Sequence, residues 1–428
     1  MVEMANSANS DSGADVSVGV ASISGLSDPA THANPYPFYD RLRARGPVFW
    51  DENAGQGGGW VVIRHSLVAA ALRDARIAAE RLDMPTDFSW APEPFNSAAR
   101  QVFRAMPHQL LFLDPPDHTR LRGLVNKAFT PRLVEGMRGH IADLTHDLLD
   151  DIEEHGEMEV IRDLAYPLPA VVIAELLGVP VADREKFIQW ATDFGGFLDS
   201  SNLTMEQALQ AIQGVADFMD YFREIIARRR VEPQDDLLQA LVAAHDRDDR
   251  MTEDELLANL VLLLAAGHGT TTHLIGNGLL ALLRNPDQYQ RLVDNPSLVP
   301  GAIAELLRYD APVQLTGRRA REELALGDVT ISAGQHLTIL LGAANHDPEQ
   351  YPNANQLDVG RAENRILSFG QGIHFCLGAP LARLEAEVVF QQVTKRFPHL
   401  RLAAPVESLE WQPSIVFRGM VALPVALT

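Results

Sequence analysis

The chain has 428 residues, of which 46% are hydrophobic and one is a cysteine, and its formal net charge is −21. Such an acidic excess argues against a nucleic-acid-binding protein, because affinity for phosphate comes from cations. A single cysteine excludes an internal disulfide and fits a reducing compartment, and no run approaches the roughly 20 apolar residues of a membrane span. We therefore expect a cytoplasmic globular protein without a nucleic-acid or membrane partner, in about three domains by length or in one large α-rich domain.

Residues 1–25 are rich in Ser, Ala, Gly and Asn and contain no basic residue. Such a segment buries little apolar surface, so we predict that it is disordered. We predict one folded domain over residues 26–428, mainly α-helical with a smaller β-rich region. In that region, residues 48–50 and 60–63 flank a glycine-rich link and predict a β-hairpin.

Residues 81–112 have no regular period and contain scattered prolines and aromatic residues, among them Phe88 and Trp90. They predict a long loop, and long loops in compact domains are often binding loops or lids. The next stretch opens a helix after a Pro pair and places His118 and Arg122 four residues apart, on one helix face. Such a pair alone is typical of a solvated surface.

Residues 133–248 have the pattern of amphipathic scaffold helices, with a glycine-containing stretch at 194–203 that we predict to be a mobile lid. The clearest helix begins with a capping box of Thr252 and Glu255 and ends at Arg284. It is apolar on most sides and must be buried. In its middle, residues 266–273 read Ala-Gly-His-Gly-Thr-Thr-Thr-His, which weakens a helix. Packing or a kink is the ordinary explanation, and we favour a functional bulge.

Three patterns follow before the chain ends. Glu305 and Arg308 are three residues apart on a predicted helix, which alone indicates only a common surface ion pair. Residues 338–341 predict a strand. Residues 413–418 and 423–425 predict a terminal hairpin.

The one cysteine, Cys376, lies in a glycine-rich stretch just before a predicted helix, in which Pro380 suits the first turn. A lone thiol is most often a small buried hydrophobe. Here, however, the glycines allow the backbone to lie against a flat ligand, and Phe369 and Phe375 add apolar walls. A helix N-terminus also favours the thiolate and is expected to lower the thiol pKa. Such a thiolate can attack a substrate or bind a metal, and haem iron needs only one thiolate.

The run Phe369-Gly370-x-Gly-x-His374-x-Cys376-x-Gly378 resembles the haem-binding loop of the cytochromes P450. The likeness extends from about residue 28 to the end of the chain. It implies haem b with Cys376 as the proximal ligand of the iron and His374 near a haem propionate. It further assigns the haem propionates to His118, Arg122 and Arg319. Arg318, next to Arg319, is a competitor for the role of Arg319.

The central helix resembles the family's distal oxygen-binding segment, with Ala266 and Gly267 in the small-residue positions and Thr270 as the threonine that supports proton delivery. The family usually has an acid where this chain has Gly269. A proton relay would then run on Thr270, on water beside Gly269 or on a substrate group.

The resemblance gives structural and pocket roles to other residues. Glu305, Arg308 and Arg361 match the family's core motif and are expected to form a lock behind the haem. The expected walls of the substrate pocket are Phe88, Trp90, Leu263, Val313, Leu315, Thr316, Ile415 and Val416. A patch that would attract an acidic ferredoxin consists of Arg120, Lys127, Arg132 and Arg138.

The resemblance implies a soluble bacterial-type monooxygenase that hydroxylates or epoxidises a medium-sized hydrophobic or aromatic molecule in secondary metabolism. Electrons would come from NAD(P)H through a ferredoxin reductase and a ferredoxin. The main alternative is a biosynthetic oxidase that couples, cyclises or desaturates without inserting oxygen. A peroxide-using enzyme is disfavoured because no arginine stands at residues 266–273, and an inactive haem scaffold is disfavoured by the intact motif residues.

Overall fold

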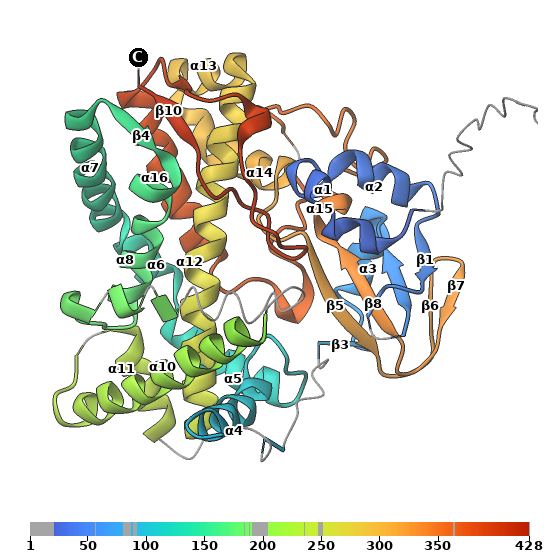
Figure 1. Cartoon of the computed structure of the whole chain (residues 1–428), viewed down its shortest axis with the longest axis vertical. Helices are drawn as coiled ribbons and strands as arrows, with labels where there is room; N and C mark the ends of the chain where they lie inside the picture. Colours follow the sequence, from blue (N-terminus) through green and yellow to red (C-terminus); the bar gives the residue numbers. More distant parts are fainter. Residues whose placement is uncertain are drawn as a thin grey trace, which may run out of the picture.

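The computed structural model describes residues 21–55, 57–79, 87–88, 92–183, 185–187, 189–190, 204–234, 236–246, 251–362 and 364–427. Helices form the larger part of the molecule and most strands gather at one side (Figure 1). The longer helices are α4 (Phe95–Ala105), α5 (Asp117–Ala128), α7 (Arg138–His155), α8 (Pro167–Leu176), α10 (Met205–Val231), α11 (Leu237–Asp246), α12 (Glu253–Arg284), α14 (Val299–Tyr309) and α16 (Ala379–Arg396). Shorter helices are α1 (Pro29–Ala33), α2 (Tyr36–Arg43), α3 (His65–Ala71), α6 (Pro131–Gly136), α13 (Pro286–Asp294) and α15 (Leu341–Asn345).

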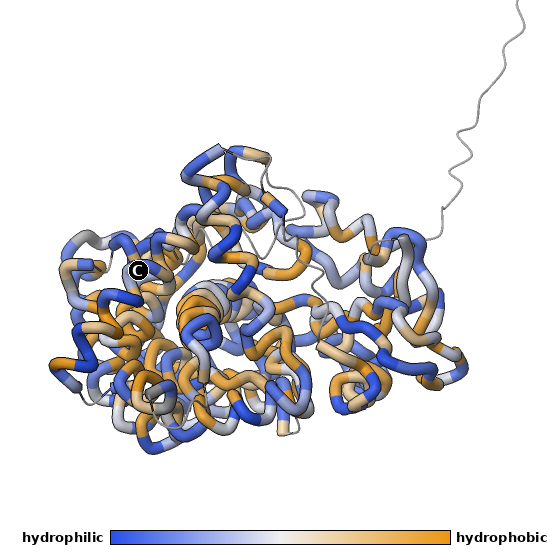
Figure 2. Tube along the Cα trace, turned by 90° about the horizontal axis from the view of Figure 1, so that it is seen from below, coloured by the Kyte–Doolittle hydropathy of each residue, from blue (hydrophilic) through white to orange (hydrophobic). Residues whose placement is uncertain are grey.

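Helix α12 is the axis of the helical part and crosses it from end to end (Figure 1). The predicted capping box is present, since the Thr252 hydroxyl accepts from the Glu255 amide and the Glu255 carboxylate accepts from the Thr252 amide. The helix packs against α8, α10, α14 and α16. A Cβ atom at Gly278 would lie 2.6 Å from Phe390 Cζ, so glycine allows α16 to approach closely. Hydrophobic residues gather between the helices and hydrophilic ones at the periphery (Figure 2).

The predicted bulge in the middle of α12 is wrong, because the helix is continuous from Glu253 to Arg284. The hydroxyls of Thr270, Thr271 and Thr272 each donate to the carbonyl four residues earlier, at 2.7, 3.3 and 3.2 Å. The threonines thus bond within the helix without opening its hydrogen-bond ladder.

The predicted hairpin is confirmed as the edge of a five-stranded sheet in the order β1-β2-β8-β5-β3. Val48 pairs with Val62 and Trp50 with Trp60 in antiparallel register. Strand β2 then pairs in parallel with β8, which contains the strand predicted over 338–341 up to Leu340. The strands of this sheet are β1 (Val48–Asp51), β2 (Gly59–Val62), β3 (Ile77–Ala78), β5 (Leu315–Ala320) and β8 (His336–Leu340). A separate two-stranded sheet consists of β6 (Leu324–Leu326) and β7 (Val329–Ile331).

The predicted C-terminal hairpin has the wrong partner. Strand β10 (Pro424–Ala426) pairs with β4 (Glu157–Glu159) and β9 (Arg401–Leu402). Residues 411–420 instead form a loop closed by a bridge between Trp411 and Met420. The pairing of β10 with these segments cannot be read from local pattern.

Two further expectations differ from the structure. Residues 21–25 are ordered where disorder was predicted, because the Asp51 carboxylate accepts from the Ser22 hydroxyl at 2.8 Å and the Ile23 amide at 3.1 Å. A short 3-10 helix follows at Ile23–Ser27. The stretch predicted to be a loop over 81–112 contains helix α4, which buries Ala98, Val102 and Ala105 at helical spacing.

The trio expected behind the haem lies together. Glu305 and Arg308 of α14 are fully buried, and both carboxylate oxygens of Glu305 accept from Arg308 at 2.8 Å. Arg361 Nε donates to Glu305 Oε2 at 2.9 Å. Arg308 also donates to the carbonyls of Asn345, Ala354 and Gln356. The trio therefore joins α14 to the chain that leads into the cysteine loop.

We predict that Glu305→Gln lowers the free energy of unfolding by about 3–5 kcal/mol, because it leaves a buried guanidinium without its counter-charge. Asp358→Asn is the control, since its ion pair with Arg291 is nearly half exposed on both sides, and it should cost less than about 1 kcal/mol. Urea unfolding of the parent and the two variants measures both losses in the free energy of unfolding. Equal losses in the two variants would contradict a locking role.

Candidate functional site

The cysteine loop is shaped by two glycines with left-handed backbone, Gly370 at φ 66° and Gly372 at φ 73°. A Cβ atom at Gly372 would lie 2.5 Å from the Leu72 carbonyl oxygen, so only glycine fits there. The Cys376 amide donates to the Phe369 carbonyl at 2.9 Å, which closes the loop just before α16 begins at Ala379. Cys376 is half-buried at this helix start, as the sequence predicted.

The thiol does not have the lowered pKa that its helix position suggested. Burial raises the pKa of Cys376 above the ordinary value and outweighs the other effects. The amides of Gly378 and Ala379 and the charges of Arg122 and Arg383 act in the opposite direction. The amides at the helix start therefore favour the thiolate, as expected, but their effect is smaller than the cost of removing the thiolate from water.

The two phenylalanines of the loop behave differently. Phe369 is partly buried, with the Arg383 guanidinium 5.0 Å from its ring centroid. Phe375 is 42% exposed, and its ring centroid lies 6.3 Å from that of Phe369. Its carbonyl oxygen accepts from Arg122 Nη2 at 2.8 Å. Helix α5 is thereby joined to the cysteine loop.

His118 and His374 come together from α5 and the cysteine loop, with ring centroids 4.4 Å apart. His118 is buried, and its Nε2 and that of His374 have no hydrogen-bond partner among the described residues. Burial, followed by the charges of His374 and Arg122, lowers the pKa of His118 to about 4. Buried polar atoms are normally hydrogen-bonded, so each of these two ring nitrogens has capacity for a further polar partner.

The structure favours Arg318 over Arg319 at this site. Arg318 is buried on β5, where its Nη1 donates to the Thr316 hydroxyl at 2.8 Å and the Gly317 carbonyl at 2.7 Å. Burial lowers its pKa to about 10, and the Asp114 carboxylate acts against this. Arg319 is less buried, and its side chain points to the opposite face because side chains alternate along a strand. The assignment of Arg319 rested on motif matching, which does not resolve the strand face.

One face of α12 is open in the middle of an otherwise buried helix. Ala266 is exposed, and Leu262, Gly269 and Thr270 on the same face are partly exposed. A Cβ atom at Gly269 would meet nothing within 4 Å, so space lies beside this residue. Gly267 lies elsewhere, because a Cβ there would be 3.1 Å from Ile173 of α8. Leu263, expected in the pocket wall, is partly buried.

The remaining pocket candidates are divided between several environments. Phe88 is buried and stacks on Phe103 at 4.9 Å, and Trp90 and the lid expected at 194–203 fall outside the described residues. Val313 packs against the sheet, and Leu315, Ile415 and Val416 belong to the cluster under the N-terminal helices. Thr316 is engaged by Arg318.

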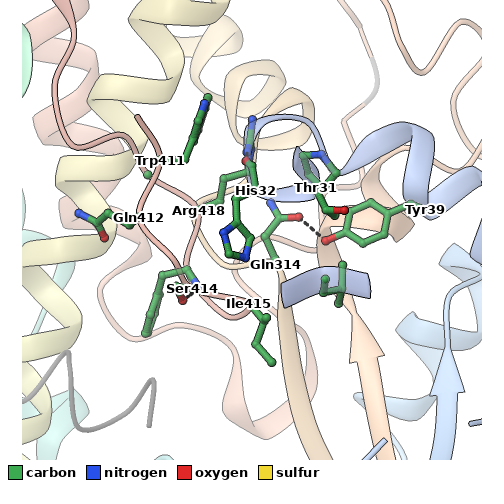
Figure 3. A pocket seen from close by; sticks show the side chains of 13 residues that line it. Thr31, His32, Tyr39, Gln314, Trp411, Gln412, Ser414, Ile415 and Arg418 are labelled. Atoms are coloured by element: carbon green, nitrogen blue, oxygen red, sulfur yellow. Dashed lines mark hydrogen bonds between the residues drawn. The ribbon is translucent and has the colours of Figure 1, made fainter. Parts of the chain in front are cut away.

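Ile415 also lines a small solvent-open hollow between the N-terminal helices and the 411–420 loop (Figure 3). Tyr39 donates to Gln314 at 2.7 Å at its edge, and Arg418 lies under it, paired with Asp310 at 2.5 Å. Gln314 and Arg418 are satisfied by these bonds and those to the Ala311, His32 and Ala33 carbonyls. These bonds join the N-terminal helices to the 411–420 loop around the hollow.

Sequence reasoning missed Glu385 of α16. It is 1% exposed, and its carboxyl is hydrogen-bonded to the hydroxyl of Thr271, the neighbour of Thr270. Burial raises the pKa of Glu385 to about 8. A charged residue on the apolar face of the predicted helix after Cys376 was the available signal.

The fold is mainly helical, and its candidate site combines a lone thiol at the start of one helix with an open, threonine-bearing face in the middle of another. The cytochrome P450 family model matches residues 71–419. The chain belongs to the cytochrome P450 family and is an oxidoreductase of the monooxygenase type.

Individual relatives cover nearly the whole chain. It is 36% identical to the 6-deoxyerythronolide B hydroxylase of Saccharopolyspora erythraea over 95% of this chain and 100% of the relative. It is 37% identical to P450BioI, solved with an acyl carrier protein bearing hexadec-9Z-enoic acid, at TM-score 0.84 over 93% of this chain and 99% of the other. It is 35% identical to CxnD, an enzyme for C–S bond formation in chuangxinmycin biosynthesis, at TM-score 0.80 over 92% and 94%.

The family implies a haem-iron cofactor, and the residues present fit it. The partnerless nitrogens of His118 and His374 and the buried guanidinium of Arg318 suit the carboxylates on one edge of haem. The Cys376 thiol would hold the iron, and the space beside Gly269 would admit a small molecule next to Thr270. None of the helices in the described part of the chain is long and apolar enough to cross a membrane.

We predict that Glu385→Gln removes a pH dependence from stability. Because the folded pKa of about 8 exceeds the unfolded value of about 4.3, the folded protein holds a proton that the unfolded chain has lost between these values. The free energy of unfolding of the parent, relative to the variant, should fall as pH rises from about 5 to 8, by up to about 1.4 kcal/mol per unit.

Denaturant unfolding at successive pH values measures this difference. Glu387→Gln, on the same helix but partly exposed and paired with Arg138, should keep the slope of the parent. An unchanged slope in Glu385→Gln would show that this carboxyl is ionised in the fold.

Proposed function

We propose that this protein binds haem b through the Cys376 thiolate and oxidises a medium-sized hydrophobic or aromatic small molecule in a biosynthetic pathway of secondary metabolism. The open face of α12 carries the proposal, because Ala266, Gly269 and Thr270 are accessible within a helix that is buried on its other sides. When bound, the haem supplies dioxygen activation, and the protein supplies position and polarity.

We propose that four residues bind the haem carboxylates: His118, Arg122, Arg318 and His374. The amides of Gly378 and Ala379 would stabilise the thiolate on which the iron depends. Because burial opposes ionisation of the free thiol, haem binding should release the thiol proton.

Thr270 is suited to position a proton donor. Its hydroxyl hydrogen is directed to the Ala266 carbonyl at 2.7 Å, so the lone pairs of the oxygen face the open side of α12. A water or a substrate hydroxyl there can donate to Thr270 and be held in place. This oxygen would orient the proton source for oxygen insertion.

The absence of an acid at Gly269 favours a second candidate, oxidative coupling, cyclisation or desaturation without oxygen insertion. Among the described residues nothing lies within 4 Å of the place of a Cβ atom there, so none of them stands directly in the place of the acid. The relative CxnD is described as forming a C–S bond. Product mass separates the two candidates, since insertion adds one oxygen and coupling removes hydrogen.

We propose NAD(P)H as the electron source, through a ferredoxin reductase and an acidic ferredoxin that docks beside the cysteine loop, in the cytoplasm. Lys127 and Arg132 are exposed there. Arg120 and Arg138, expected in the same patch, are engaged with Glu255 and with Glu135 and Glu387. The docking proposal therefore rests on the first two cations and on the exposed Phe375.

We predict that Thr270→Ala lowers product formed per NAD(P)H consumed by about tenfold or more, because the positioned proton donor is lost. Thr272→Ala is the matched control, since its hydroxyl makes the same bond to the carbonyl four residues back but is buried away from the open face. Both are measured with a reconstituted electron-transfer chain and 18O2. An equal yield of product per NAD(P)H in the parent and in Thr270→Ala would contradict the proposed role of Thr270.

We predict that Gly269→Asp folds normally, because its Cβ meets no atom of the described residues within 4 Å. If oxygen insertion is the native reaction, this variant should form more product per NAD(P)H consumed than the parent. Mass spectrometry of the products identifies the reaction. A product without added oxygen in both the parent and this variant would favour the coupling oxidase and overturn the monooxygenase assignment.

A further inference from the structure

The carboxylate of Asp114 lies at the junction of four segments. It precedes helix α5, and its backbone carbonyl accepts from the His118 amide at 3.0 Å. One oxygen accepts from the Ala79 amide, just after β3, at 3.2 Å, and the other pairs with Arg321 Nη2 at 3.0 Å. The side chain of Asp114 is 8% exposed. A carboxylate that is nearly buried is retained only where its neighbours compensate it.

The neighbours of Asp114 include the groups proposed above to receive the haem carboxylates. His374 Nε2 lies 3.8 Å from Asp114 Oδ1. The charge of Asp114 also acts on His118 and on the buried guanidinium of Arg318. Asp114 therefore lies close to His374, and its charge acts on His118 and Arg318.

A carboxylate beside a site for two other carboxylates would be expected to repel them. The pairing with Arg321 at 3.0 Å makes Asp114 and Arg321 together a neutral unit at longer range, which weakens that repulsion. At short range the carboxylate attracts His374 Nε2, which lies 3.8 Å from Oδ1, and its charge also acts on His118 and Arg318. Groups behind the primary contacts of a cofactor commonly act in this manner.

We propose that Asp114 is a positioning residue for haem binding: its charge, held by Arg321 and the Ala79 amide, orients His374, Arg318 and His118 toward the haem carboxylates. This inference rests on the proposed haem site and adds a residue that does not itself contact the cofactor. Asp114 also joins this cluster to the end of β3.

Haem transfer from the holoenzyme to excess apomyoglobin tests the proposal. Asp114→Asn keeps an acceptor for the Ala79 amide but removes the charge, so haem should be lost about tenfold faster or more. Asp114→Glu keeps the charge and should restore most of the retention. The control is Asp117→Asn, three residues along the chain, whose side chain is 58% exposed, and it should release haem at the parent rate.

The reduction potential of the iron is a second measurement. A general loss of stability would not shift this potential in a fixed direction. Removing the buried negative charge in Asp114→Asn should shift it to more positive values, while Asp117→Asn leaves it nearly unchanged. If Asp114→Asn does not fold, Arg321→Gln replaces it, with faster haem loss again expected.

A transfer rate for Asp114→Asn within twofold of the parent, or slower, overturns the proposal whatever the potential shows. This failure is distinct from failure of the proposed function, in which the parent protein itself would lack the spectrum of a haem-thiolate protein.

Discussion

A 32-residue helix that must be buried along most of its length, yet leave one short face uncovered, is the constraint on which this structure depends. Burial requires close neighbours, and Gly267 and Gly278 allow α8 and α16 to approach. The uncovered face requires small residues, and Ala266 and Gly269 provide them. Because the threonine hydroxyls bond to carbonyls of the same helix, the segment stays helical despite two glycines and three threonines.

Charged side chains surround the cysteine loop and its neighbours. Arg122, Arg318 and Arg383 approach the cysteine loop or its neighbours, while Asp114 and Glu385 are buried acids nearby. Glu385 is kept neutral by burial and bonds to Thr271, so the helix that follows the thiol is joined directly to the threonine-bearing helix. Farther back, the ionised trio of Glu305, Arg308 and Arg361 fixes the chain that leads into the loop. The thiol and the threonine are thus held relative to one another through side chains as well as backbone.

Features set by local sequence were predicted well. The capping box of α12, the first hairpin and the helix start after Cys376 each depend on residues within a few positions of one another. Features set by distant residues were missed. Ser22 and Ile23 are ordered by Asp51, which lies beyond two intervening helices. Strand β10 likewise pairs with β4, from a distant part of the chain, and with β9, the preceding strand, from which the 411–420 loop separates it.

The site itself was predictable in kind but not in detail. Sequence drew attention to the thiol, the histidines and the threonine-bearing segment of the central helix, but it predicted a bulge there and not an open helix face. The choice between Arg318 and Arg319 needed the strand face, and the raised thiol pKa needed the burial of the loop. Asp114 and Glu385 act through neighbours that only the folded chain brings together.

Ligation of haem iron by the Cys376 thiolate is the central claim, and the absorption spectrum of the purified, reduced protein under carbon monoxide tests it most directly. The account predicts a strongly red-shifted Soret band in the parent that is absent from Cys376→Ser. A parent that binds no haem, or a band that persists in Cys376→Ser, would contradict it.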